Sequence, residues 1–134
     1  FVFERGEAYL LALFADEIAG LYRARSFVSA GVALGAGSDA PYGDANPWRS
    51  MVAAQQRRTR GGRMLGADEC LDAAALLRLY GSSAQHPGGD CRSLQVGAVA
   101  DLCVLDRGWE ALFEGLGDVR VRLTLGRGRV LHAA

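Results

Sequence analysis

The spacing of apolar residues predicts three helices in the first 90 residues of this 134-residue chain. Residues 10–25 place an apolar or long side chain at every third or fourth position, which is typical of an amphipathic helix. Asn46 is a favourable N-cap and Pro47 a favourable first residue for a second helix, which we expect to end at residues 60–62. Residues 67–83 predict a third helix that is apolar over a broad face and therefore buried.

Patterns typical of strands occur in one place early in the chain and again towards its end. Residues 32–34 form a short apolar run directly after Gly31 and predict a buried parallel strand. Residues 100–105 predict another strand, and residues 119–125 alternate apolar and polar side chains at period two. The following Gly-Arg-Gly sequence predicts a turn into a last strand over residues 129–132.

A helix-breaking segment, His86-Pro87-Gly88-Gly89-Asp90, is the best candidate boundary in the chain. It predicts one region over residues 1–90 and a second, strand-rich region over residues 91–134. Two or three strands with one polar face are not stable alone. We therefore expect the second region to pair with strands from elsewhere.

Composition is that of a soluble globular domain and excludes several classes of function. Fifteen basic residues balance fifteen acidic ones, which argues against nucleic acid or an acidic membrane as the main partner. No apolar run approaches the roughly 20 residues that span a bilayer. Every basic residue is arginine, which hints at a GC-rich bacterial genome.

The three cysteines carry no recognisable site. Their number is odd and their spacing shows no C-x-x-C pair, so a cytoplasmic, reducing location fits them best. Cys103 lies within an apolar strand and is predicted to pack in the core, and Cys70 is predicted to pack on a helix.

The strongest chemical signal is the acid that follows the predicted strand at residues 32–34. Small residues, Gly35 to Ser38, lead to Asp39, and Pro41 then prevents simple continuation of the strand. Ligands bind at the carboxyl ends of parallel strands in α/β folds. A single carboxylate in that position suits a metal ligand or a general base. The alternative is a turn or helix-capping acid. Asp44, on the loop beyond the proline, is expected to face solvent.

Other motifs favour structural interpretations. Residues 35–40 satisfy a G-x-G-x-x-A dinucleotide pattern, but Pro41 and Gly43 spoil the helix that must follow. The arginine-rich residues 55–63 lack interleaved aromatic side chains and fit a solvated helix end. His86 is interpreted as a surface loop residue, with substrate contact as the alternative. A Ser38–His86–aspartate triad lacks the nucleophile-elbow motif.

Together these segments resemble amidohydrolase family 3 of the amidohydrolase superfamily, which includes N-substituted formamide deformylases. Gly37-Ser38-Asp39-Ala40-Pro41 resembles the end of the family's last barrel strand. Further similar segments, in the family's order, are residues 3–9, 25–32, 46–51, 57–59, 93–106 and 121–130. The sequence departs from the family at Arg92, where glycine is usual, at Ala98, where lysine is usual, and at residues 86–89.

The resemblance implies an α/β fold, the C-terminal part of a (β/α)₈ TIM-type barrel with strands of a composite β-sandwich. Such a barrel takes about 250 residues, so the chain is expected to be a C-terminal portion. It implies hydrolysis of a non-peptide C–N bond, of amide or formamide type, in a small-molecule substrate. A divalent metal, usually zinc, would lower the pKa of a bound water. Asp39 would ligate that metal, take the water's proton and deliver it to the leaving nitrogen.

The remaining metal ligands implied by the resemblance are histidines and a lysine or acid that this chain does not supply. They are expected from a missing N-terminal barrel portion or from a second chain, and a homo-oligomer is the expected assembly. The alternative is a catalytically inert fragment or assembly module that lacks the metal cage.

Overall fold

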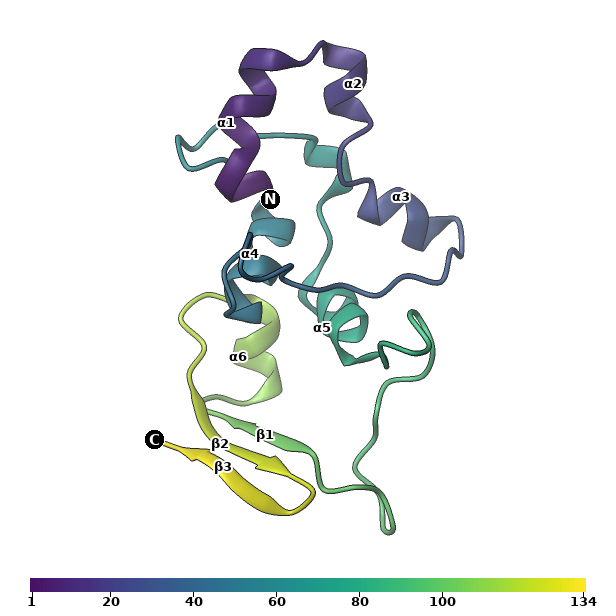
Figure 1. Ribbon diagram of the computed structural model, residues 1–134, viewed down its shortest axis with the longest axis vertical. Helices are drawn as coiled ribbons and strands as arrows, with labels where there is room; N and C mark the ends of the chain where they lie inside the picture. The colour runs from purple at the N-terminus through teal and green to yellow at the C-terminus, as the bar shows by residue number, and fades with distance from the viewer.

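The computed structural model describes residues 1–134 as an elongated arrangement of short helices with a small sheet at one end (Figure 1). None of these helices combines the length and the hydrophobicity that a membrane-spanning helix needs. In chain order the elements are α1 (Val2–Ala12), α2 (Ala15–Ala19), α3 (Ala24–Ser29), α4 (Pro47–Gln56), the 3₁₀ helix η1 (Ala67–Glu69), α5 (Ala73–Gly81), β1 (Leu102–Leu105), α6 (Trp109–Glu114), β2 (Val121–Gly126) and β3 (Arg129–Ala133).

Helix α4 begins as its sequence predicts and ends earlier. The Asn46 Oδ1 atom accepts a hydrogen bond from the Trp48 N–H at 3.0 Å, and Pro47 is the first helical residue. Arg57 ends the helix by adopting a left-handed conformation, with φ of 47°. The predicted end at residues 60–62 is therefore wrong, because those residues belong to the turn that follows.

The two longer helices predicted from periodicity are each broken, because local side chains capture backbone groups. Residues 10–25 form parts of α1, α2 and α3, and the Glu17 carboxylate accepts the Phe14 N–H at 2.8 Å at the start of α2. Residues 67–83 contain η1 and then α5, which Asp72 caps by accepting the Ala75 N–H at 2.7 Å. Cys70 accordingly lies just beyond η1, half-buried, and not on a helix.

The hydrophobic core forms where α4, α5 and α6 meet. Met51 of α4, Leu76 of α5 and Leu112 of α6 are buried in one cluster, and Leu116 joins them from the segment after α6. Helix α6, which the apolar pattern did not reveal, therefore carries residues from beyond position 90 into contact with α4 and α5 (Figure 1).

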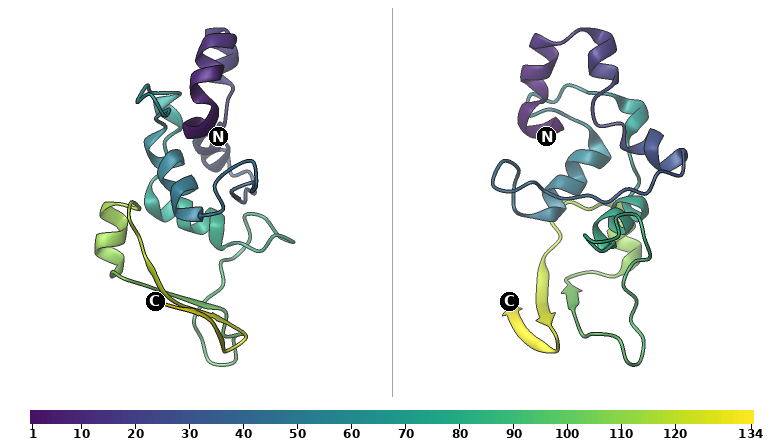
Figure 2. Two further views of the ribbon diagram at one scale, coloured as in Figure 1. Left: turned by 60° about the vertical axis from the view of Figure 1, so that its left-hand side comes forward. Right: turned by 45° about the vertical axis from the view of Figure 1, so that its right-hand side comes forward.

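The three strands form one antiparallel sheet in the order β1-β2-β3. The period-two prediction is confirmed, and Gly126 pairs with Arg129 across the turn between β2 and β3. β1 and β3 are both edge strands. Figure 2 shows the sheet at the opposite end of the molecule from α1 and α2. Cys103, opposite Thr124, is exposed on the edge strand β1, so its predicted core packing is wrong.

The strand predicted at residues 32–34 does not form in this chain. Residues 32–39 have no regular secondary structure, and Val32 is 50% exposed. A parallel strand needs neighbouring strands for its backbone hydrogen bonds and its apolar side chains. The chain offers this segment none. Mixed helix and strand content fits the α/β class.

Candidate active site

Asp39 is placed by a tight turn at the end of the irregular segment 32–38. It adopts a left-handed conformation, with φ of 53°, which aspartate tolerates better than most residues. Its carbonyl oxygen accepts the N–H groups of Tyr42 at 2.9 Å and Gly43 at 3.1 Å. A Cβ atom on Gly43 would lie 2.1 Å from the Ser38 carbonyl oxygen, so the turn requires glycine there. The Asp39 side chain is exposed and belongs to none of the chain's five ion pairs.

A shallow pocket of about 250 Å³ opens beside this turn. Its lining combines four aromatic rings with one guanidinium and one carboxylate: Phe1, Arg5, Tyr9, Tyr22, Asp39 and Tyr42. Such a lining suits a small substrate with an apolar part and a polar, neutral part. The structure thus brings the predicted site residue Asp39 together with side chains of α1 and of the turn before α3.

Two tyrosines join one wall of this pocket. The hydroxyl oxygens of Tyr9 and Tyr22 lie 3.0 Å apart, and the Tyr22 ring stacks on Phe1 with centroids 6.1 Å apart. Burial, followed by the hydrogen bond to Tyr9, raises the pKa of Tyr22 well above its ordinary value. Tyr22 is therefore neutral at physiological pH.

The segment that leads to Asp39 rests on the end of α5 and on the loop that follows it. The Ala36 N–H donates to the Leu79 carbonyl oxygen at 3.0 Å. Gly88 of the loop lies so close that a Cβ atom there would stand 2.5 Å from the Leu34 nitrogen. His86 belongs to this loop, is exposed, and is not among the residues that line the pocket. Neither His86 nor Ser38 joins Asp39 in the pocket lining.

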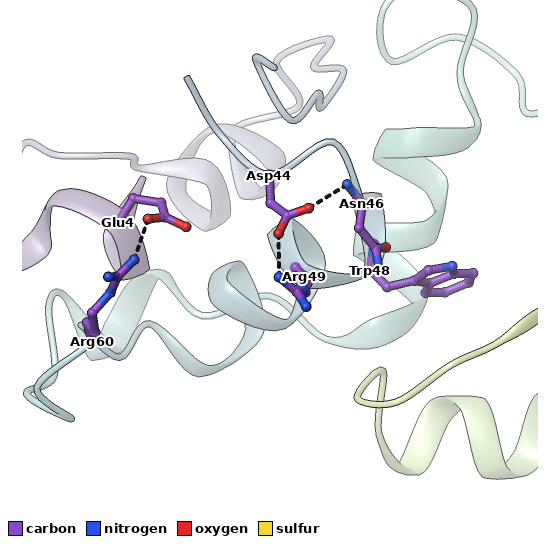
Figure 3. A network of polar contacts seen from close by, with 6 residues as sticks. All are labelled: Glu4, Asp44, Asn46, Trp48, Arg49 and Arg60. Carbon is purple, nitrogen blue, oxygen red and sulfur yellow. Dashed lines mark hydrogen bonds and ion pairs between the residues drawn. The ribbon is translucent and has the colours of Figure 1, made fainter. Parts of the chain in front are cut away.

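Asp44, which is expected to face solvent, is partly exposed and is engaged at the start of α4. Its carboxylate accepts the Asn46 N–H at 2.8 Å and pairs with the Arg49 guanidinium at 2.6 Å (Figure 3). The Asn46 N–H, and then Arg49, lower the pKa of Asp44 below its ordinary value. Asp44 therefore acts in the local structure of this helix end, and not in the pocket.

The residues of this chain do not by themselves fit a catalytic zinc ion. Such sites use about three protein ligands. No group of three or more histidine, cysteine, aspartate or glutamate side chains gathers anywhere in the chain. In the pocket lining, Asp39 is the one acid, and the other charged side chain is the cation Arg5.

Sequence reasoning found Asp39 but missed the rest of the pocket lining. Arg5 and Tyr9 are four residues apart on α1, so both lie on one face of the helix. Their spacing in the sequence was enough to predict this. The contact between Tyr22 and Tyr9 could not be predicted from the sequence, because it depends on how the turn before α3 folds back against α1. Tyr42 follows Pro41 closely, but nothing in its spacing distinguishes it from a loop residue.

Comparison with known proteins identifies the family of the chain. The family model described as "Amidohydrolase family" matches residues 4–132. An N-substituted formamide deformylase of Arthrobacter pascens is 37% identical over 90 residues, which is 65% of this chain and 17% of that relative's length. The chain thus spans only a small part of the curated relative that it matches. No solved structure matches it. The family match covers nearly every residue, and the chain belongs to the amidohydrolase family.

Proposed function

We propose that this chain is the C-terminal portion of a hydrolase that cleaves a non-peptide C–N bond, of amide or formamide type, in a small molecule. The observation that carries the proposal is the position of Asp39. Its carboxylate lies at an aromatic pocket, outside every ion pair, on a backbone held in the left-handed region. Non-glycine residues held in the left-handed region cluster at functional sites. The family match and the deformylase relative support the reaction class.

In the proposed reaction, the Asp39 carboxylate acts first as a general base and then as a general acid. It accepts a proton from the attacking water as the water oxygen bonds to the substrate carbonyl carbon. It then returns that proton to the nitrogen as the C–N bond breaks, so a carboxylic acid and an amine leave. The aromatic side chains of the lining would hold the apolar part of the substrate.

The complete site is proposed to include residues that this chain does not contain. Asp39 would contribute one ligand to a divalent metal, for which the family resemblance favours zinc. The other ligands would come from an N-terminal barrel portion or a second chain. The composite β-sandwich, a homo-oligomeric assembly and a cytoplasmic location belong to the same proposal. The relative's much greater length supports it, since this chain matches 17% of that protein.

Formate release tests the proposed reaction. The whole protein in the form in which it purifies should release formate from members of a panel of N-alkyl- and N-arylformamides. The variant Asp39→Asn should release at least about 100-fold less, the size of a general-base contribution. Wild-type protein that hydrolyses no amide or formamide, when fully metallated, would contradict the proposal.

A second candidate is a catalytically inert fragment or assembly module. It is favoured by the absence of a cluster of metal-ligating side chains in the chain. Intact-mass measurement together with metal analysis separates the two candidates. A purified species of this mass that lacks both metal and hydrolytic activity would favour the inert module.

A further inference from the structure

Arg57 is a buried cation that no carboxylate pairs with. Its side chain is at the end of α4 and the residue is 2% exposed. Burial lowers its pKa from the ordinary value, yet an arginine stays protonated under all physiological conditions. A charge in this position needs strong local partners.

Its partners are three backbone carbonyl groups from two separate segments. The Arg57 Nε–H donates to the Leu65 carbonyl oxygen at 2.7 Å. The two terminal nitrogens donate to the Tyr22 carbonyl oxygen at 3.0 Å and the Leu21 carbonyl oxygen at 3.1 Å. The guanidinium fork therefore ties the turn before α3 to the segment before η1.

The turn held by Arg57 is the one that carries Tyr22 into the Asp39 pocket. Tyr22 has a φ of 52°, an uncommon conformation for a bulky residue, which surrounding structure must enforce. Two of the three hydrogen bonds of Arg57 end on this turn, at Tyr22 and at its predecessor. The same conformation sets the Tyr22 hydroxyl against Tyr9 and its ring against Phe1.

We propose that Arg57 is a positioning residue for the substrate pocket: by hydrogen bonding to the carbonyl groups of Leu21 and Tyr22 it fixes Tyr22 in the pocket that Asp39 also lines. Arg57 does not line the pocket, so it acts through Tyr22. The functional part of this inference rests on the proposed function, because Tyr22 affects turnover only if the pocket takes the substrate.

Gly66 offers a way to move the Arg57 side chain without touching the pocket. A Cβ atom on Gly66 would lie 2.8 Å from a terminal nitrogen of Arg57, the one that donates to Leu21. Gly62 is a matched control. Both glycines have positive φ, 66° and 83°, so alanine is strained at both, but a Cβ atom on Gly62 would meet nothing within 4 Å.

The experiment labels the whole protein, in the form in which it purifies, with 3-fluorotyrosine and records fluorine NMR spectra. The resonances of Tyr22 and Tyr80 are assigned from the signal that each Tyr→Phe variant removes. Gly66→Ala should move the Tyr22 resonance towards its position in the unfolded protein and leave that of Tyr80, on α5, in place. Gly62→Ala should move neither. Arg57→Lys keeps the positive charge but loses the guanidinium group that bonds to several carbonyls, so it should shift the Tyr22 resonance as Gly66→Ala does. Arg58→Lys, at the exposed neighbouring position, is its control.

Kinetics supplies the second readout. In Gly66→Ala we expect KM for a formamide substrate to rise roughly two- to tenfold, the range of one aromatic contact, while kcat changes little. The proposal would be overturned if the Tyr22 resonance stays in place in Gly66→Ala and Arg57→Lys. It would also be overturned if that resonance moves while KM stays unchanged. Wild-type protein without turnover would count against the proposed function alone, because the Tyr22 resonance tests the clamp without substrate.

Discussion

The Cγ2 methyl group of Thr59 lies directly against the backbone of Gly6 in α1, where an added Cβ atom would stand 2.5 Å from it. Thr59 is buried, and its hydroxyl group donates to the carboxylate of Glu7, 52 residues away in the sequence. These contacts fasten α1 to the turn after α4. Since α1 also carries Arg5 and Tyr9 of the pocket, this junction sets one side of the candidate site.

The Gly6–Thr59 contact predicts that Gly6→Ala destabilises the protein. Alanine gains about 1 kcal/mol of helix propensity, but overpacking against the methyl group costs about 1–3 kcal/mol. Thr59→Ser removes the methyl group and keeps the hydroxyl bonded to Glu7. The double variant Gly6→Ala/Thr59→Ser should therefore be more stable than Gly6→Ala in urea unfolding. If it is no more stable, the steric contact is not the cause.

Asp39→Asn should lower the turnover rate without lowering the stability of the fold. Asparagine has the same size but cannot take a proton from water, so kcat should fall at least about 100-fold. The melting temperature should barely change, because the Asp39 carboxylate joins no ion pair.

Asp44→Asn is the matched comparison for Asp39→Asn. It should lower the melting temperature and spare kcat, because it removes the charge that pairs with Arg49. If Asp39→Asn instead lowers the melting temperature as its main effect, Asp39 is a structural turn residue and the site is misassigned.

Asp106 predicts a specific loss of stability in acid. Hydrogen bonding from Arg107, followed by the Arg120 N–H, lowers the pKa of Asp106 to about 2 from an ordinary value of 3.8. A lowered carboxyl pKa stabilises the folded state above the unfolded pKa. That stabilisation is present above pH 3.8 and is lost as pH falls towards about 2. Asp106→Asn should flatten this part of the curve of unfolding free energy against pH.

The open sheet predicts that the chain is unstable as a lone monomer. Both edges of the β1-β2-β3 sheet are unpaired, and Val130 and Leu131 of β3 are 63% and 70% exposed. Only 13 of the 134 residues are buried, too few for a self-sufficient core. Sedimentation velocity should show self-association or a bound partner. A monodisperse monomer with a cooperative thermal melt would contradict this prediction.

Zinc binding should require more than this chain. A single carboxylate such as Asp39 binds zinc weakly, and catalytic sites use about three protein ligands. Elemental analysis of the isolated chain after dialysis should find no stoichiometric zinc. Tight binding of one zinc ion per chain would show that the site has been assigned to the wrong residues.

Local chemistry made parts of the fold predictable. The start of α4 follows from Asn46 and Pro47, whose side chains favour a helix start wherever they occur in this order. The β2–β3 hairpin follows from alternating side chains and a glycine-containing turn. Asp39 was singled out because its segment resembles the family's strand end, and its role in catalysis stays a prediction.

What escaped prediction depends on partners distant in the sequence. The segment at residues 32–34 has the composition of a strand, but a strand forms only beside other strands. The break between η1 and α5 accompanies the capture of Glu69 by Ser26, whose N–H donates to that carboxylate at 2.9 Å. Helix α6 is short, and its Leu112 becomes informative only once α5 is in place. The periodicity of apolar residues along the chain carries no information about these distant contacts.

The close approach of Gly88 to Leu34 has a practical consequence for engineering the pocket. No side chain larger than hydrogen fits at Gly88, so this point of the loop is a fixed anchor for the segment that leads to Asp39. Residues inserted at the anchor would displace the acid along with the loop. The exposed residues Ala84 and Gln85 precede the anchor in the same loop. New loop sequences inserted at Ala84 and Gln85 should change the surface near the site and leave the position of Asp39 unchanged.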